Sequence, residues 1–240
     1  MIRSPLFLFP LMTRREALTL LGAFLGLRGT TSAAEGNAIT TERGLMGTRF
    51  AVTCHHADEA LVRKAIAAAF EEADRINAVA SDYIADSELL SLSKQPVGQA
   101  TAISPLLFSL IREAWEYAEK TEGLFDPTLG PPPKLWRESR RRKALPTPEV
   151  LAKAKAACGW KHLILDPEKS TVILAVPGMR LDLGGIAKGQ AADAMLAVLV
   201  KNGLKSSSVP AGGDVRMGDP PPGAEGWKVG VRTSDKNRDS

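Results

Sequence analysis

The chain has 240 residues, of which 44% are hydrophobic and 24% are charged, and its formal net charge is +4. Four arginines and one glutamate lie within residues 1–34, so the remainder carries a net charge of only +1. The basic balance therefore gives no support for nucleic-acid binding, and the roughly 200 residues that follow are enough for one large or two small domains.

The first 34 residues have the order of a secretory signal peptide. The pair Arg14-Arg15 precedes an apolar segment at 17–27, and small residues lead to an expected cleavage after Ala33 or Ala34. The arginine pair is also typical of a twin-arginine signal, which would export the folded protein to the periplasm. The apolar segment is short and interrupted for a membrane-spanning helix; an uncleaved anchor is the alternative.

Hydrophobic periodicity and turn residues then predict an alternation of strands and helices. In chain order we expect a strand at 45–54, a helix at 58–79, a polar loop with a short helical turn at 81–94, a helix at 104–120, loops at 122–136 and 137–143, a helix at 147–157, a hairpin of strands at 162–165 and 171–176, a helix at 186–202, and strands at 206–209 and 227–231 around a loop at 212–226. The mixture lacks a regular β–α–β rhythm and favours an α+β fold.

The two cysteines, Cys54 and Cys158, could pair in an oxidising compartment, but two isolated positions make no disulfide framework. The three histidines have no ligand spacing, so a metal site built from cysteine and histidine is not expected. The basic run at 137–143 is interpreted as a solvated loop rather than a polyanion site.

The sequence DLGGIAKG at 182–189 is the sharpest candidate for a functional site. Glycines let the backbone approach a ligand closely, and a helix N-terminus favours phosphate. Lys188 adds a point charge, while Asp182 could accept a hydrogen bond from a ligand. Glycines used for tight strand-to-helix packing are an equally good explanation of the motif taken alone.

Two further loops carry residues suited to ligand binding. Tyr83 lies in a polar loop, where its ring could stack on a flat ligand or simply pack on the surface. Asp126 follows Leu124 and Phe125 in a second loop, where an Asx-type turn ahead of proline is the ordinary reading. Each feature is weak by itself.

The order and spacing of several motifs nevertheless resemble the FAD:protein FMN transferases of the ApbE family. The motifs are MGTRF (46–50), SDYIADSEL (81–89), EGLFDPTLGP (122–131), KLW (134–136), LDLGGIAKG (181–189), AGGDVRMG (211–218) and WKVGV (227–231). The resemblance covers nearly the whole chain after the signal peptide. It implies a T-fold-like α+β architecture of mixed sheets with flanking helices.

The resemblance also implies an activity: transfer of the FMN part of FAD, through a phosphoester, to a Thr or Ser of an acceptor flavoprotein, with Mg²⁺ and release of AMP. The acceptor would be exported or attached to the inner membrane. By motif, the main-chain oxygen of Gly185 would bind the metal. The residues that would contact FAD are Met46, Tyr83, Leu124, Phe125, Asp126, Asp182 and Lys188.

One family motif, of the form H-x-x-D-P-x-T-G, has no counterpart before residue 240. In the family it supplies metal ligands and the residues that activate the acceptor hydroxyl, so no catalytic residue is assigned here and the C-terminal part of the domain is expected to be missing. Three hypotheses stay open: a flavin transferase, an FAD-binding module without transfer, and an inactive truncated product.

Overall fold

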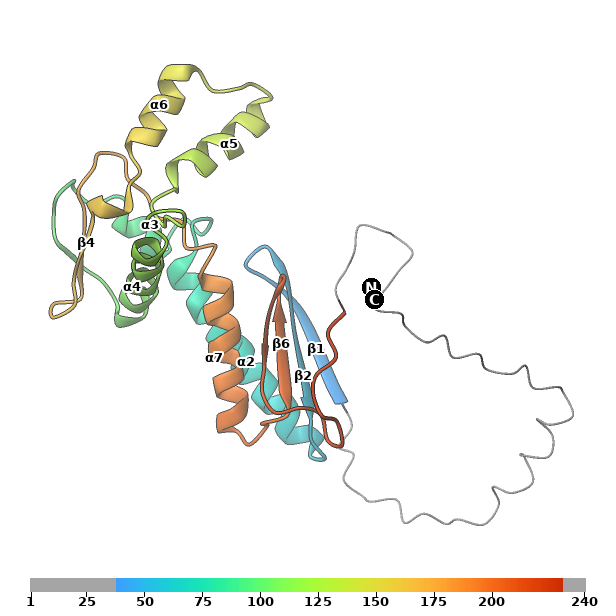
Figure 1. Cartoon of the computed structure of the whole chain (residues 1–240). Coiled ribbons are helices and arrows are strands. Elements are labelled where there is room, and N and C mark those ends of the chain that lie inside the picture. The colour runs from blue at the N-terminus through green and yellow to red at the C-terminus, as the bar shows by residue number, and fades with distance from the viewer. Residues whose placement is uncertain (1–37, 231–240) are drawn as a thin grey trace, which may run out of the picture. The chain divides into compact units, whose positions relative to one another are not determined.

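The computed structural model describes residues 38–230; the expected signal peptide and Val231 fall outside this range. As predicted, the fold is α+β: two antiparallel sheets with helices packed beside them (Figure 1). The four-stranded sheet has the order β1-β2-β6-β7 and the three-stranded sheet the order β3-β5-β4. The strands are β1 (Ala38–Leu45), β2 (Thr48–His55), β3 (Thr101–Ala102), β4 (Leu163–Asp166), β5 (Thr171–Leu174), β6 (Ser207–Ala211) and β7 (Asp214–Met217). The helices are α2 (Glu59–Ala80), α3 (Glu88–Leu92), α4 (Pro105–Lys120), α5 (Pro131–Arg142), α6 (Pro148–Ala156), the short 3-10 helix η1 (Trp160–His162) and α7 (Ala187–Lys201).

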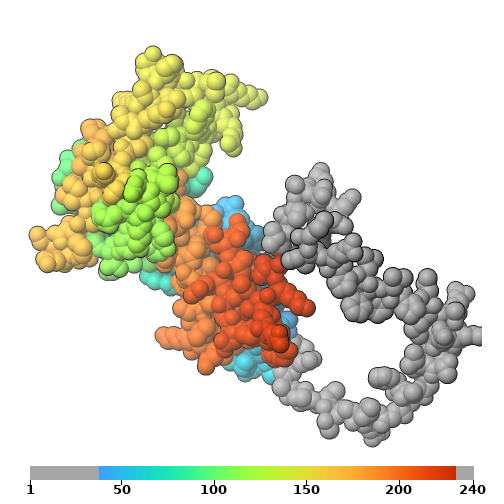
Figure 2. Space-filling model, viewed as in Figure 1, coloured from blue at the N-terminus to red at the C-terminus, as the bar shows by residue number. Residues whose placement is uncertain are grey.

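Helices α2 and α7 pack against each other and against the four-stranded sheet (Figure 1). On β2, Phe50, Val52 and Cys54 are fully buried, whereas the residues between them are not. This alternation places one face of the strand in the core, as the period of a strand requires. Phe50 pairs with Ala211 of β6, so the start and the end of the described chain lie side by side, as the blue and red surfaces in Figure 2 show.

Side-chain caps fix the starts of several helices. Asp58 Oδ1 accepts a hydrogen bond from Leu61 N at 2.9 Å at the start of α2, and Ser104 Oγ accepts one from Leu107 N at 3.2 Å at the start of α4. Such caps satisfy backbone donors that have no partner within the helix. The four helices predicted from periodicity are confirmed, as are the hairpin of β4 and β5 and the short helical turn after Ser87.

The single strand predicted at 45–54 is wrong at its beginning. Met46 and Gly47 form a two-residue turn with φ angles of 49° and 72°, and the chain before it forms β1, which the sequence did not reveal. Positive φ at both turn positions matches the right-handed twist of a tight hairpin. Strand β1 was missed because half of its sequence, AITTERGL, is polar and most of it is exposed, so it has no alternating apolar pattern. The two-residue strand β3 was also missed.

The loops predicted at 122–136 and 137–143 are wrong from Pro131 onward, where α5 begins. Prolines break a helix in its interior, but they fit the first turn, where their missing N–H groups have no helical partner. The basic run therefore lies on a helix, which ends at Lys143 in a left-handed conformation. Arg140, Arg141 and Arg142 are exposed, as predicted for this run, whereas Ser139 is buried and Arg137 is partly buried.

The strand predicted at 227–231 is not found over its described residues, 227–230, and β7 forms instead at 214–217. Gly212 and Gly213 have positive φ angles, which let the chain turn directly from β6 into β7. Trp227 anchors the following segment instead: its Nε1 donates hydrogen bonds to the carbonyl oxygens of Gly218 and Asp219 at 3.2 and 3.0 Å.

Both cysteines are free thiols in this structure. Cys54 is buried on β2, and its Sγ accepts a hydrogen bond from Ser207 Oγ at 3.2 Å. Burial raises the pKa of the Cys54 thiol and outweighs the opposite effect of this hydrogen bond, so the thiol stays protonated. Across residues 38–230, no helix has both the length and the apolar character needed to cross a membrane.

Two leucines with opposite burial test the core. Leu107 on α4 is fully buried, and Leu145 after α5 is 81% exposed. We expect Leu107→Ala to lower the free energy of unfolding by about 2–5 kcal/mol, because it removes buried apolar surface and leaves a cavity. The control Leu145→Ala should change it by less than about 0.5 kcal/mol. Urea titrations measure both; equal effects would contradict the described core.

Candidate functional site

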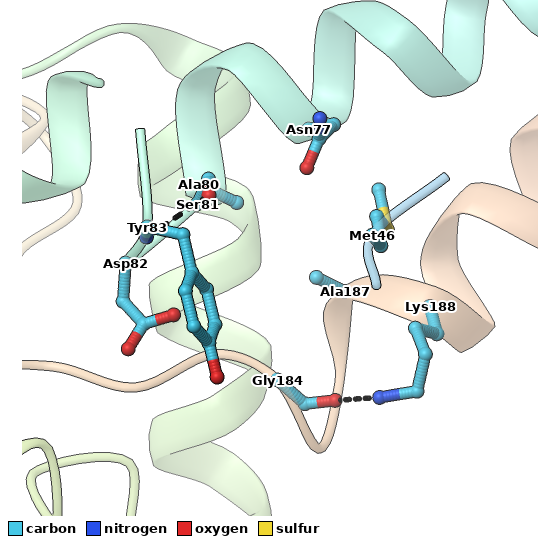
Figure 3. A pocket seen from close by; sticks show the side chains of 9 residues that line it. All are labelled: Met46, Asn77, Ala80, Ser81, Asp82, Tyr83, Gly184, Ala187 and Lys188. Carbon is cyan, nitrogen blue, oxygen red and sulfur yellow. Dashed lines mark hydrogen bonds between the residues drawn. The ribbon is translucent and has the colours of Figure 1, made fainter. Parts of the chain in front are cut away.

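Three segments far apart in the sequence meet at one cleft (Figure 3). They are the β1–β2 turn, the end of α2 with the loop after it, and the start of α7 with the turn before it. The cleft is lined by Met46, Asn77, Ala80, Ser81, Asp82, Tyr83, Gly184, Ala187 and Lys188. Three of the predicted site residues, Met46, Tyr83 and Lys188, are therefore brought together.

The turn before α7 is braced by its own charged side chains. Asp182 Oδ1 accepts a hydrogen bond from Gly184 N at 2.8 Å, and Lys188 Nζ donates one to the carbonyl oxygen of Gly184 (Figure 3). Helix α7 begins without a capping side chain at Ile186. The arrangement leaves a lysine cation and a helix N-terminus beside the cleft, a combination that favours a phosphate group.

The same turn is tied through its backbone to the loop that contains Asp126. Asp182 N donates a hydrogen bond to the carbonyl oxygen of Pro127 at 2.8 Å, and Gly130 N donates one to the carbonyl oxygen of Arg180 at 3.2 Å. A Cβ atom on Gly130 would lie 2.7 Å from the Arg180 oxygen, so only glycine permits this approach. The two predicted motifs are thus in direct backbone contact.

Phe125 and Gly185 line a second cleft, on the other side of the glycine pair. A Cβ atom placed on Gly185 would lie 3.0 Å from Phe125 Cε2, which shows how closely the ring packs on this turn. Gly184 lines the first cleft and Gly185 lines the second, so the two clefts lie on either side of this glycine pair. Of the predicted site residues, Phe125 and Gly185 are found here.

The other predicted residues line neither cleft. Asp126 Oδ1 accepts hydrogen bonds from Thr128 N at 2.8 Å and Thr128 Oγ1 at 2.6 Å, and its Oδ2 accepts one from Trp160 N at 3.2 Å. The bond from Thr128 N to Asp126 Oδ1 is that of an Asx-type turn, and the bond from Trp160 N ties this turn to η1. Leu124 is 94% exposed, and the Asp182 carboxylate accepts the hydrogen bond from Gly184 N. Their predicted contacts with FAD stay predictions.

Tyr83 is the aromatic residue among those that line the first cleft, and 76% of its surface is exposed. Its backbone N donates a hydrogen bond to Ser81 Oγ at 3.1 Å, which shapes the loop after α2. Next to it, Asp82 Oδ2 pairs with Arg137 Nη2 of α5 at 2.6 Å. In Figure 3 the Tyr83 ring and Lys188 lie on opposite sides of the cleft, with Gly184 between them.

Sequence reasoning missed Asn77, Asp82 and Arg137. Asp82 precedes Tyr83 in the quoted motif and could have been singled out as a carboxylate in the same loop. Arg137 could not, because it is one of several basic residues in a row and its partner lies 55 residues away. Asn77 belongs to the regular pattern of α2, and nothing distinguishes it from a surface residue.

The described side chains do not form a metal site by themselves. Among residues 38–230, no three His, Cys, Asp or Glu side chains gather closely enough to hold a metal ion. Mg²⁺ often binds through few protein oxygens together with substrate phosphates. The predicted metal contact of the Gly185 main-chain oxygen stays a prediction.

Comparison with known proteins gives one consistent result. The model of the ApbE family matches residues 46–240. A FAD:protein FMN transferase of Treponema pallidum is 36% identical over 160 residues, which cover 61% of this chain and 44% of the relative. The solved flavin transferase ApbE from Vibrio cholerae is 27% identical with a TM-score of 0.71, over 81% of this chain and 64% of that one.

The ApbE protein from Thermotoga maritima is similar in structure with a TM-score of 0.74 and 27% identity, over 85% of this chain and 66% of that one. The predicted α+β architecture with flanking helices is thereby confirmed, and both of its sheets are antiparallel rather than mixed. The chain spans about half the length of the curated relatives that it matches.

The two glycines at 185 and 189 offer a matched test of the turn. We expect Gly185→Ala to lower the free energy of unfolding by about 1–3 kcal/mol, because the added methyl group must displace the Phe125 ring. No atom lies within 4 Å of a Cβ on Gly189, which is inside α7, so Gly189→Ala should be neutral or stabilise by up to about 1 kcal/mol. Thermal and urea unfolding measure both; an undisturbed Gly185→Ala would contradict the packing.

Proposed function

The chain belongs to the ApbE family, and on this premise we propose that it is an FAD:protein FMN transferase. FAD is the substrate, and the acceptor is a Thr or Ser hydroxyl of another flavoprotein. The acceptor oxygen forms a phosphoester with the FMN phosphorus, the bond from that phosphorus to AMP breaks, and the hydroxyl proton is released. AMP is the second product.

The observation that carries the proposal is the cleft that joins Tyr83 and Lys188. An exposed aromatic ring offers a face for the flat flavin ring, and a lysine beside an uncapped helix start offers positive charge for a diphosphate. FAD contains both chemical groups in one molecule. A ligand with only one of them would leave half of the cleft without a partner.

The described residues can contribute to transfer by positioning and electrostatics. Asp182 holds the Gly184 turn in shape, and Lys188, whose ammonium now rests on the Gly184 carbonyl, can turn to a phosphate oxygen. Phosphoryl transfer depends mainly on orientation and on stabilising charge as it moves to the leaving group. Met46 supplies an apolar wall from the β1–β2 turn.

Mg²⁺ dependence is part of the proposal. The metal would neutralise charge on the diphosphate as AMP leaves. Because residues 38–230 contain no cluster of three metal-binding side chains, we derive no step through the metal from this part of the chain. The sequence of residues 1–34 supports export by the twin-arginine route to the periplasm, where the acceptor would be an exported or inner-membrane flavoprotein.

Transfer is tested by incubating the full chain with FAD, Mg²⁺ and an acceptor protein that carries an Asp-Gly-x-Thr/Ser-Gly-Ala-Thr/Ser motif. We expect flavin fluorescence on the acceptor band after denaturing electrophoresis, and none when the acceptor hydroxyl is replaced by Ala or when Mg²⁺ is chelated. FAD binding with no labelled acceptor would overturn transfer and favour a binding module. No FAD binding at all would contradict the assignment of the cleft.

A further inference from the structure

We propose that Arg137 is a positioning residue that holds the Tyr83 ring in the orientation that receives the flavin. The inference rests on the proposed function, because it takes FAD as the ligand of the cleft. It assigns a role to a residue of α5 that does not itself line the cleft.

One guanidinium contacts two neighbours in the loop after α2. The Cζ atom of Arg137 lies 4.5 Å from the centroid of the Tyr83 ring, and its Nη2 lies 2.6 Å from Asp82 Oδ2. An arginine can do both at once, since its flat face stacks on the ring while its edge donates to the carboxylate. Neighbouring residues of the loop are thus fixed by a single side chain.

The pair between Arg137 and Asp82 is better shielded from water than most ion pairs among residues 38–230. Their side chains are 31% and 13% exposed, whereas those of Arg63 and Glu59 on α2 are 65% and 62% exposed. Exposed pairs are weakened by water and salt, and partly buried pairs much less so. Asp82 therefore provides a firm anchor for the guanidinium beneath the ring.

Arg137 keeps its charge throughout the accessible pH range. Burial works against that charge, but the interactions with Asp82 and Tyr83 outweigh burial, so the pKa of Arg137 lies above its ordinary value. The contact with the ring is therefore not lost through deprotonation of the arginine.

Tyr83 needs such a contact because little else holds its side chain. The ring is 76% exposed, and the hydrogen bond from Tyr83 N to Ser81 Oγ fixes the backbone only. An exposed side chain changes rotamer freely, and ordering it when a ligand binds costs free energy. With Arg137 against one face of the ring, the ring is ordered in advance and its other face is left for a flat ligand.

Other arginines of α5 provide a matched control. Arg140, Arg141 and Arg142 are exposed and pair with no carboxylate within 4.0 Å among the described residues, whereas Arg137 contacts Asp82 and the Tyr83 ring. Arg141→Gln removes the same charge from the same helix. Any change in FAD affinity caused only by the loss of one positive charge on α5 should therefore appear in R141Q as well, while Tyr83 stays undisturbed.

The test is a titration of the full chain with FAD. Binding is monitored by the quenching of flavin fluorescence and by the change in the flavin absorption spectrum. We expect R137Q to weaken FAD binding by about three- to thirty-fold and to reduce the quenching at saturation, and R141Q to change neither. R137K should retain only part of the wild-type FAD affinity and quenching, because lysine keeps the charge but lacks the flat, forked group.

A double-substitution cycle separates positioning from a general loss of structure. In Y83L, whose altered side chain is exposed, R137Q should cause little further loss of affinity, because Arg137 acts through the ring. An equal loss with and without the ring would overturn the inference, as would wild-type affinity and quenching in R137Q. Should R137Q fail to fold, R137K against R141K gives the same comparison.

The outcomes also separate this inference from the proposed function. If the unsubstituted chain does not bind FAD, both the proposed function and the role of Arg137 are overturned. A chain that binds FAD but labels no acceptor removes transfer and leaves the role of Arg137 to be judged from the affinities and the quenching.

Discussion

The site depends on a close backbone contact between residues 127–130 and 180–182. Two hydrogen bonds, to the carbonyl oxygens of Pro127 and Arg180, hold these two segments together. Gly130 permits the close approach, because a Cβ atom at this position would clash with the Arg180 carbonyl oxygen. The contact places Phe125 against Gly185 and directs the next turn into α7. Lys188 and the β1–β2 turn can then face Tyr83 across one cleft.

A second constraint comes from pairing across the chain. The register that joins Phe50 to Ala211 puts the N-terminal hairpin beside the C-terminal strands, and α7 packs against the same sheet. Met46, at the tip of that hairpin, consequently reaches the start of α7. The cleft is therefore a product of the whole four-stranded layer, and its three walls have no sequence proximity to each other.

The sequence could predict the features that leave a pattern among neighbouring residues, but not the contacts between residues far apart in the chain. The long helices were predictable because Leu107, Ile111 and their neighbours recur at helical spacing behind a capping serine. Helix α5 was hidden by prolines that signal a loop unless they stand in a first turn. Motif order singled out Met46, Tyr83 and Lys188, which line one cleft. The contact between Arg137 and Tyr83 joins separate elements and leaves no local pattern in the sequence.

An experimental structure of the full chain bound to FAD tests the site most directly. We expect the flavin ring on the free face of Tyr83, with Arg137 on the opposite face, and the diphosphate beside Lys188 at the start of α7. A flavin bound elsewhere, or one in this cleft without contact to Tyr83 and Lys188, would contradict this expectation.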